Sequence, residues 1–336
     1  MKRTKPHEPE TTTPVAVGPS LLITGGAGYL GQLLVERLTT ERKRFGRIVA
    51  CDIRAPRRPY STAIEFRALD IRAPEMRTLI RDGGFDVVVH LATVVTAPKG
   101  MTREEMRSID VGGTENVLKG CLDGGVGKII VTSSGAAYGY HADNAPLLTE
   151  ECPLRGNDEF PYAQHKRMVE ELLARYREAH PQLKQLILRP GTILGRNVKN
   201  PITDLFEKPV IVGVKGQASP FVIIWDQDVV EVLTQATLRD VTGTFNLAGD
   251  GVLTLKEIAS LLGKRYIEIP ISWMQQGLRL LQKAGLSQYG PEQLSFLLYR
   301  PVLSNERLKR AFRYTPKLTT RQVFELYRGG ALKRSA

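Results

Sequence analysis

The segment Thr24–Gly31 reads TGGAGYLG and lies between a short apolar run and a stretch with helical periodicity. A glycine-rich turn between a strand and a helix is typical of a dinucleotide-binding βαβ unit. The glycines allow a tight turn and a close approach to a pyrophosphate, and the helix presents its first N–H groups to the phosphates. The loop residues expected to bind the cofactor are Gly25, Gly28, Tyr29, Leu30 and Gly31.

An acidic residue follows at the distance that such a unit requires. Asp52 ends the next predicted strand, Arg47–Asp52. A carboxylate there accepts a hydrogen bond from the adenosine ribose 2′-hydroxyl and repels a 2′-phosphate, so NAD is expected as the cofactor. Arg54, Arg57 and Arg58 lie just beyond and could accommodate a 2′-phosphate, which leaves NADP as the less favoured alternative.

The first half of the chain alternates strand and helix patterns. Continuous Val/Ile/Leu runs indicate strands that are buried on both faces, and helix-length segments between them indicate βαβ units. The sequence therefore predicts an α/β fold, a doubly wound parallel sheet (Rossmann fold) with a smaller C-terminal substrate lobe. The predicted strands lie at 21–24, 47–52, 64–69, 85–92, 128–132 and 183–188.

The chain is expected to have three parts. Residues 1–19 indicate a disordered lead-in, because they are rich in Thr, Pro and Glu and lack the apolar region of a secretory signal. Residues 20–190 and 221–248 are assigned to an NAD-binding core. Residues 191–220 and 249–330 are assigned to a substrate-binding lobe.

Composition excludes several classes of protein. No apolar run approaches the roughly 18 residues of a membrane span, so at most a weak peripheral membrane association is considered. The three cysteines are far apart, so we expect no disulfide, no metal site and a cytoplasmic location. The net charge of +12 suits an anionic cofactor. No nucleic-acid partner is expected, because no nucleic-acid-binding motif accompanies the basic residues.

A second motif supplies candidate proton-handling groups. Tyr162 and Lys166 are four residues apart at the start of a predicted helix and hence share one face. A tyrosine hydroxyl, with a pKa of about 10, is a poor base at neutral pH, but a nearby ammonium group lowers that pKa. Ser133 and Ser134 follow the fifth predicted strand, at the sheet edge where such folds bind ligands.

With these motifs the chain resembles the extended short-chain dehydrogenase/reductase family, in particular its NAD-dependent epimerase/dehydratase group. The resemblance spans residues 21 to about 327 and is dense up to Arg189. Besides the glycine loop and Tyr162–Lys166, it rests on Asp70-Ile71, His90-Leu91-Ala92, Val111–Val117 and Val131–Gly139.

The resemblance implies roles for individual residues. Ser134 would bind the substrate oxygen, Tyr162 would act as base or acid, and Lys166 would be its partner. Lys166 would also hold the nicotinamide ribose, so Tyr162 and Lys166 count as cofactor contacts as well. The remaining expected cofactor contacts are Asp70 and Ile71 at the adenine, and Leu91, Ala92, Thr93 and Pro190 elsewhere along the dinucleotide. A homodimer through helices at 101–122 and 158–179 is also implied.

Departures from the family pattern narrow the activity. Gly135 and Ala136 stand where sugar dehydratases carry an Asp-Glu pair, which argues against dehydration. Asp110 replaces the usual Asn before the glycine-threonine stretch. Thr192 occupies the position of an Asn that binds a nucleotide-sugar diphosphate, and Pro220–Asp226 lacks the usual His and Arg.

Three functional hypotheses remain open. The first is a nucleotide-sugar epimerase or dehydrogenase that acts on a secondary alcohol. The second uses the same chemistry on an apolar, steroid-like or lipid-linked alcohol. The third is a non-catalytic NAD sensor or RNA-binding relative. We expect His90 to support its strand end, His165 to face away from the site, and the amphipathic segment Ser272–Leu286 to face the core or cover the substrate, with an interfacial helix as the alternative.

Overall fold

The computed structural model describes residues 18–98, 100–196, 198–283 and 294–335. Most of the expected lead-in, residues 1–17, and the end of the predicted helix Ser272–Leu286 lie outside the described residues. No helix within the described ranges is long and apolar enough to cross a membrane.

A seven-stranded sheet with every neighbouring pair parallel forms the centre of the fold. The sheet confirms the expected doubly wound α/β architecture, because its order reverses between β1 and β4. From one edge to the other the strands are β11 (Gly243–Leu247), β6 (Lys184–Pro190), β5 (Lys128–Thr132), β4 (Val87–His90), β1 (Leu21–Thr24), β2 (Ile48–Asp52) and β3 (Glu65–Ala68).

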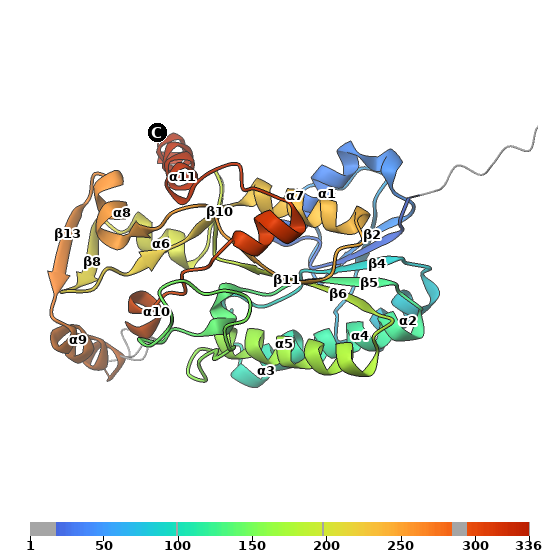
Figure 1. Cartoon of the computed structure of the whole chain (residues 1–336), viewed down its shortest axis with the longest axis horizontal. Helices are drawn as coiled ribbons and strands as arrows, with labels where there is room; N and C mark the ends of the chain where they lie inside the picture. The colour runs from blue at the N-terminus through green and yellow to red at the C-terminus, as the bar shows by residue number, and fades with distance from the viewer. Residues whose placement is uncertain (1–17, 99, 197, 284–293, 336) are drawn as a thin grey trace, which may run out of the picture.

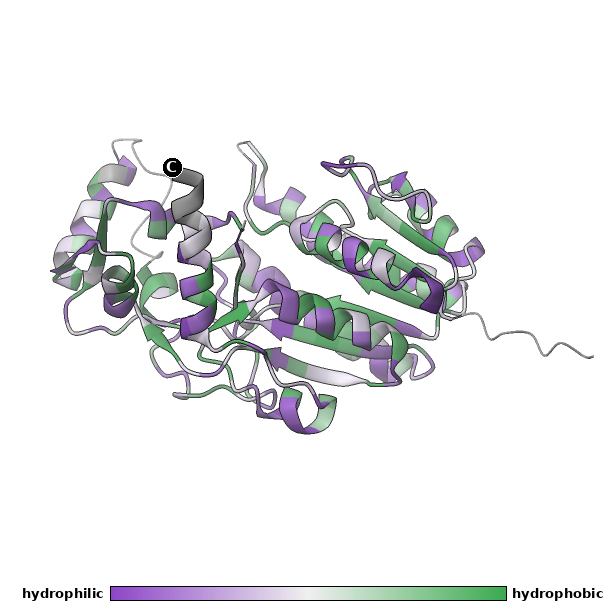
Figure 2. Ribbon diagram, turned by 90° about the horizontal axis from the view of Figure 1, so that it is seen from above, coloured by the Kyte–Doolittle hydropathy of each residue, from purple (hydrophilic) through white to green (hydrophobic). Residues whose placement is uncertain are grey.

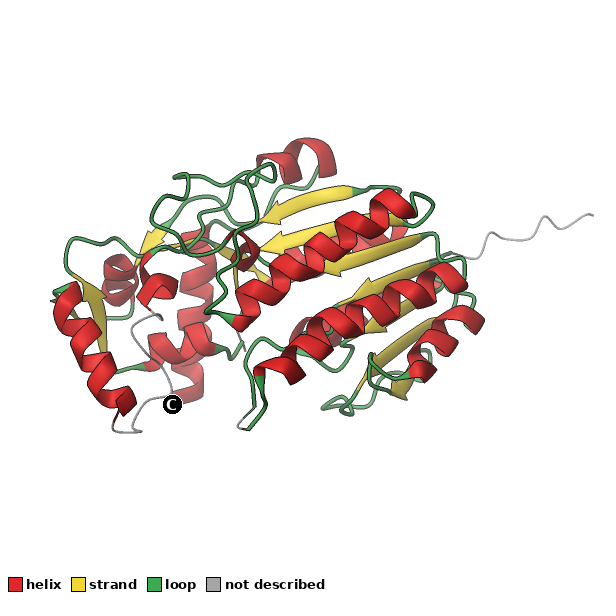
Figure 3. Cartoon of the chain, turned by 90° about the horizontal axis from the view of Figure 1, so that it is seen from below, coloured by secondary structure: helices red, strands yellow, loops and turns green. Residues whose placement is uncertain are grey.

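Helices cover both faces of this sheet (Figure 1). One face carries α1 (Tyr29–Thr40) and α7 (Asp226–Leu238). The other carries α2 (Pro74–Asp82), α4 (Gly113–Asp123) and α5 (Pro161–Ala179), which lie in front of the strands in Figure 3.

Alternation along β1 explains how one strand serves both layers. Leu21 and Ile23 pack into the cluster on the α1/α7 side, and Leu22 packs into the cluster on the α2/α4/α5 side. Successive side chains of a strand point to opposite faces, so a fully apolar run can be buried from both sides. Figure 2 shows the strands of the large sheet coloured mostly as hydrophobic, between helices with purple outer faces.

The helix predicted at 101–122 is interrupted. It comprises α3 (Arg103–Arg107), a π-helical turn at Ser108–Gly112 and α4. Single π-turns inside helices occur frequently at functional sites. This turn carries Asp110, one of the positions at which the sequence departs from the family pattern.

Smaller elements pack at the carboxyl end of the sheet around a separate apolar cluster. Their strands pair two by two: β7 (Thr192–Leu194) with β10 (Ile223–Trp225), β9 (Pro220–Phe221) with β12 (Leu253–Thr254), and β8 (Val210–Val214) with β13 (Arg265–Ile269). The accompanying helices are α6 (Pro201–Glu207), α8 (Leu255–Leu261), α9 (Ile271–Lys283), α10 (Leu294–Leu298) and α11 (Thr320–Ser335).

The strand β13 was not expected, because the sequence after residue 249 was interpreted as mostly helical. The backbone N–H and C=O groups of β13 find their hydrogen-bond partners in the parallel strand β8. In α9, Met274 and Leu278 pack on the cluster of Val214, Leu294 and Leu298, whereas Trp273 and Leu280 are exposed. The helix therefore faces the core with one side only.

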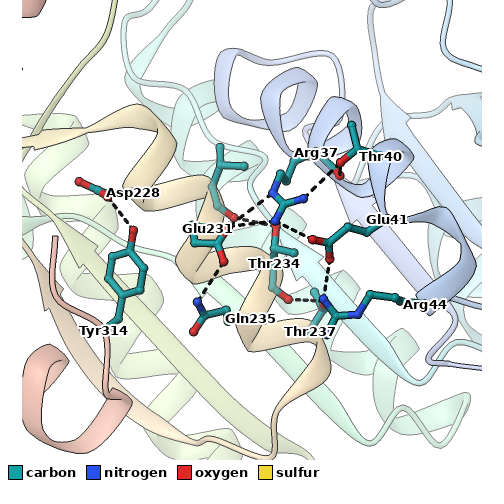
Figure 4. A network of polar contacts seen from close by, with 11 residues as sticks. Arg37, Thr40, Glu41, Arg44, Asp228, Glu231, Thr234, Gln235, Thr237 and Tyr314 are labelled. Carbon is teal, nitrogen blue, oxygen red and sulfur yellow. Dashed lines mark hydrogen bonds and ion pairs between the residues drawn. The ribbon is translucent and has the colours of Figure 1, made fainter. Parts of the chain in front are cut away.

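An ion pair joins α1 to α7, the two helices on one face of the sheet (Figure 4). The guanidinium of Arg37 lies 2.6 Å from Glu41 on its own helix and 3.2 Å from Glu231 on α7. At the start of α7, the hydroxyl of Tyr314 donates a hydrogen bond of 2.6 Å to the buried carboxylate of Asp228. The Arg37–Glu231 pair thus fixes α1 to α7, and the Tyr314–Asp228 bond fixes the C-terminal part of the chain to α7.

Candidate active site

The glycine loop is packed so tightly that two of its glycines have no room for a side chain. Gly25 has a φ of +70°, and a Cβ there would lie 2.6 Å from the backbone nitrogen of Ala92. A Cβ on Gly31 would lie 2.2 Å from the carbonyl oxygen of Gly25. The loop therefore lies directly against the start of the segment that follows β4. Gly28 is the N-cap of α1 and makes no side-chain hydrogen bond to the first turn of the helix.

The structure brings Asp52 to this loop. Its carboxylate accepts hydrogen bonds of 3.1 Å from the backbone N–H groups of Ala27 and Arg54. A carboxylate has about four acceptor positions, so capacity remains for a ribose hydroxyl. The side chains of Arg54, Arg57 and Arg58 are exposed just beyond it.

The other expected cofactor residues lie at the carboxyl ends of neighbouring strands. Leu91, Ala92 and Thr93 follow β4 and are half-buried, and Pro190 ends β6. Asp70 pairs with Arg72 at 2.6 Å, and the side chain of Ile71 fills the space beside Gly113. The hydroxyl of Tyr29 donates a hydrogen bond of 2.5 Å to Asp226, so its ring is directed toward α7.

Ser134, Tyr162 and Lys166 come together beyond the carboxyl end of β5. The Ser134 hydroxyl forms a hydrogen bond with Tyr162. The Lys166 ammonium lies 5.6 Å from the centre of the Tyr162 ring and donates to the carbonyl oxygen of Thr132 at 2.9 Å. Proline at the first position of α5 starts this helix, so Tyr162 stands in its first turn.

Burial opposes the charged forms of this pair. It raises the pKa of Tyr162 well above its ordinary value, although the hydrogen bond from Ser134 lowers that pKa. Burial also lowers the pKa of Lys166, against the carboxylates of Asp110 and Glu170, which raise it. Without a positive ligand, Tyr162 is therefore held as the neutral phenol.

A buried polar network joins α5, the helix that carries Tyr162 and Lys166, to the sheet. Glu170, one turn after Lys166, forms an ion pair of 2.6 Å with Arg189 on β6. It also accepts a hydrogen bond of 2.5 Å from Ser133, the neighbour of Ser134. Arg189 in turn donates to the hydroxyl of Tyr138 at 2.7 Å. Sequence reasoning did not identify these roles, because the partners are far apart in the chain.

Two histidines near the site are buried. His90 bonds with Thr24 and Thr114 and, as expected, supports the end of its strand. Burial lowers the pKa of His90 to about 3, so its ring is neutral. His165 lies 2.9 Å from a carboxylate oxygen of Asp110, an unforeseen contact between α5 and the π-helical turn.

The structure also brings in a cation that sequence reasoning missed. Arg300 lies against the rings of Phe221 and Phe296, and one of its nitrogens donates to the hydroxyl of Thr192 at 3.0 Å. Another nitrogen, Nη1, is buried with no hydrogen-bond partner among the described residues. By the resemblance, Thr192 stands at the position of an Asn that binds a diphosphate, and it is one of the departures from the family pattern. The segment Pro220–Asp226 itself lacks an arginine, but Arg300, which is distant in the sequence, lies against Phe221 of that segment.

A surface cleft of about 520 Å³ borders this group of aromatic residues. Tyr140 and Tyr299 line it, and the Tyr140 ring centre lies 5.0 Å from that of Phe296. Within the described part of the chain, no cluster of His, Cys, Asp or Glu could hold a metal ion.

Comparisons with known proteins agree with this geometry. Residues 21–215 match the model of the NAD dependent epimerase/dehydratase family. An uncharacterised protein of Mycobacterium tuberculosis is 25% identical over 313 residues, which cover 91% of this chain and 82% of that protein.

Two solved structures have the same fold. The UDP-glucose 4-epimerase of Thermotoga maritima, in complex with UDP-glucose, superposes with a TM-score of 0.73 at 19% identity, over 94% of this chain and all of that one. The Bordetella bronchiseptica enzyme WbmG, in complex with NAD and UDP, gives a TM-score of 0.72 at 17% identity, over 95% of this chain and 96% of that chain.

Proposed function

Because this chain belongs to the NAD dependent epimerase/dehydratase family, we propose that it transfers a hydride at a secondary alcohol with NAD as cofactor, as a nucleotide-sugar epimerase or dehydrogenase. The observation that carries the proposal is the meeting of Ser134, Tyr162 and Lys166 at the sheet edge that also holds the glycine loop. Doubly wound sheets bind dinucleotide and substrate at this edge.

The residues present fit a dinucleotide. Gly25 and Gly31 shape a loop that has no room for side chains, the N-terminus of α1 adjoins this loop, and Asp52 stands beside it with free acceptor positions. Tyr29, Leu30, Asp70, Ile71, Leu91, Ala92, Thr93 and Pro190 remain proposed contacts. When bound, the nicotinamide would accept or return the hydride and add a positive charge near Tyr162.

The chain's own residues would handle the proton. Ser134 donates a hydrogen bond to the substrate oxygen and orients it toward Tyr162. As the phenolate, Tyr162 takes the proton of the alcohol during oxidation, and as the phenol it returns that proton during reduction. The Lys166 ammonium favours the phenolate, because an opposite charge nearby stabilises the charged form. Thr132 holds that ammonium in place through its carbonyl oxygen.

An anionic substrate is favoured by Arg300. A buried guanidinium nitrogen without a partner is costly, so a ligand that accepts from it would bind favourably. Diphosphate oxygens suit the planar donor set of arginine. The structural neighbours in complex with UDP-glucose and with UDP make a nucleotide sugar the first class of substrate to test.

Dehydration is not proposed. Gly135 packs so closely that a Cβ there would lie 3.0 Å from the side chain of Leu303, and Ala136 is buried. Because these two residues are glycine and alanine, the turn after Ser134 carries neither an acid nor a base for elimination.

A second candidate uses the same chemistry on an apolar alcohol. The aromatic side chains of Phe221, Phe296 and Tyr140 around Arg300 favour it. The dimer through the helices at 101–122 and 158–179 also remains a proposal. So do a location in the cytoplasm and the division of the chain into a lead-in, an NAD-binding core and a substrate-binding lobe. A purely NAD-sensing or RNA-binding role is the least favoured, because the Ser, Tyr and Lys side chains are all in place.

The first experiment releases and identifies the cofactor. The purified protein is denatured, and the nicotinamide dinucleotide is quantified by absorbance and mass. Near-stoichiometric NAD favours an epimerase, and an empty site with weak NAD affinity favours a dehydrogenase. Recovery of NADP would contradict the role given to Asp52. Tritium exchange or product analysis with UDP-glucose and with a steroid alcohol then separates the two substrate classes.

The decisive variant is Tyr162→Phe. We expect it to bind NAD as the wild type does but to lose turnover by a factor of about 10²–10⁴, because only the proton-handling hydroxyl is removed. Tyr176→Phe, on the same helix, is the matched control and keeps full activity. Full activity of Tyr162→Phe would show that the proton passes through another group.

A further inference from the structure

The Asp110 side chain is a junction between three segments. Its carboxylate accepts hydrogen bonds from the Thr93 hydroxyl at 2.9 Å, the Val94 backbone N–H at 2.8 Å and His165 at 2.9 Å. Both Asp110 and His165 are almost completely buried, at 3% and 1% exposure. One carboxylate thus ties the turn after β4 to the catalytic helix.

The pairing determines how the histidine ring is protonated. An ionised carboxylate can only accept, so the ring nitrogen that faces it, Nδ1, must carry a hydrogen. The other nitrogen, Nε2, is buried and has no partner among the described residues. Among the described residues, the hydrogen bond with Asp110 alone therefore determines which ring nitrogen of His165 carries the hydrogen.

The same network reaches the glycine loop. The carbonyl oxygen of Asp110 accepts from the Thr114 hydroxyl at 2.5 Å, Thr114 lies 3.0 Å from His90, and His90 bonds with Thr24 at 2.7 Å. Thr24 is the last residue of β1, directly before Gly25. Hydrogen bonds thus run without interruption from the start of the cofactor loop to the helix that carries Tyr162 and Lys166.

The charge of Asp110 acts on the groups that face it. On α5 these are Tyr162, Lys166 and His165, and at the end of β4 it is His90. Glu170 is the second carboxylate near Lys166. Family members carry a neutral amide at this position. With such an amide here, Glu170 would be the one carboxylate among the described residues that stabilises the buried ammonium of Lys166.

We propose that Asp110 and His165 form a positioning pair that clamps the cofactor-lining turn Thr93–Val94 to α5, the helix that carries Tyr162 and Lys166. The clamp rests on the proposed NAD-dependent function. The tautomer that it requires does not, so the two can fail separately.

The first test needs no substrate. Nitrogen-15 NMR of histidine-labelled full-length protein reports which ring nitrogen carries the hydrogen. We expect the Nδ1–H form of His165 in the wild type, assigned by its loss in His165→Asn. In Asp110→Asn the new amide donates to Nδ1, so the signal changes to the Nε2–H form. An Nε2–H ring in the wild type, or no change in Asp110→Asn, overturns the pairing.

The clamp is tested by cofactor affinity. His165→Leu removes the donor and should raise the Kd for NAD by about tenfold, the size expected for losing one hydrogen bond to a charged group. His165→Asn places an amide donor where Nδ1 stands and should restore most of the affinity. Gln164→Ala, the neighbouring substitution on α5, is the control and leaves the Kd unchanged. Equal weakening in His165→Leu and His165→Asn would show a packing role only.

The pairing requires an ionised Asp110, and the pH profile of alcohol oxidation tests that charge. Removing a negative charge lowers the pKa of Tyr162, so the ascending limb of kcat/KM in Asp110→Asn should move to lower pH by roughly 0.5–1 unit. A limb that stays in place, with kcat reduced at every pH, would show that Asp110 carries no charge near Tyr162 and overturns the ionised pair. If no substrate is turned over at all, the proposed function fails, while the NMR result still decides the pairing.

Discussion

At the scale of single residues, the site is built from groups whose burial works against their charge. Tyr162 is held neutral by burial, and Lys166 is disfavoured as an ammonium for the same reason. The carboxylates of Asp110 and Glu170 favour the ammonium form of Lys166, and the Ser134 hydroxyl lowers the pKa of Tyr162, whereas the Asp110 carboxylate raises the pKa of Tyr162 further. Small changes in charge near Tyr162 should therefore change the pH dependence of the reaction before they change the fold.

Replacing Lys166 tests this directly. Lys166→Met removes a positive charge beside Tyr162, so the pKa of the phenol rises. The ascending limb of kcat/KM for oxidation should then move to higher pH, opposite to the change expected for Asp110→Asn. The measurement is a pH–rate profile at saturating NAD, with circular dichroism to check the fold. A limb at the wild-type position would separate Lys166 from the protonation of Tyr162.

Arg300 offers a test of substrate class. Arg300→Met should raise KM for a nucleotide sugar by about 10- to 100-fold, because it removes charge-assisted hydrogen bonds to a diphosphate. The Kd for NAD should stay unchanged. Arg310→Met, at a highly exposed position, is the matched control. An unchanged KM for the nucleotide sugar would instead favour the apolar-alcohol candidate.

At the scale of elements, the close contact between the glycine loop, α1 and the turn after β4 sets the geometry of the proposed cofactor site. The carbonyl oxygen of Gly25 occupies the space where a Cβ of Gly31 would stand. The interrupted helix α3–α4 places Asp110 beside α5 through its π-turn. Both features depend on where the backbone lies. Even a substitution as small as glycine to alanine in the loop should therefore change the free energy of unfolding markedly.

A pair of glycine substitutions separates packing from helix propensity. Gly31→Ala should destabilise the protein by about 1–3 kcal/mol, because the new methyl overlaps a backbone carbonyl. Gly329→Ala, in α11 with open space around it, should stabilise the protein by about 0.5–1 kcal/mol. Urea unfolding measures both. Equal effects of the two substitutions would contradict the tight packing of the loop.

At the scale of the whole molecule, residues 308–314 share a hydrophobic core with β1 and α1. Leu308, Phe312 and Tyr314 lie in the expected substrate lobe by sequence, yet they pack in the same cluster as β1 and α1. Phe312 meets the ring of Phe245 edge-on at 5.4 Å, and Arg239 lies over its face. The segment after residue 303 thus links the lobe to the large sheet.

This link predicts cooperative unfolding. Phe312→Ala should cost about 3–5 kcal/mol and lower the melting temperature of the whole chain in a single transition. Ile53→Ala, at an exposed apolar residue, is the control with little effect. Calorimetry of wild type and variants measures this. A separate low-temperature transition in Phe312→Ala would mean that the lobe unfolds independently.

Local sequence determined most of the fold and the centre of the site. Apolar runs of strand length, a glycine turn and the Tyr162–Lys166 spacing act over a few residues, so they can be interpreted without knowing what packs against them. The same local signals placed Asp52 and Ser134 at strand ends, and parallel strands bring such ends to one edge.

Tertiary structure alone decided the partners of these groups. Arg300 meets Thr192, His165 meets Asp110, and β13 pairs with β8 across long separations in the chain. No local pattern encodes such pairings, because they follow from how whole elements pack. The charge balance around Tyr162, and with it the pH at which the site works, is therefore a property of the folded molecule that its sequence motifs do not show.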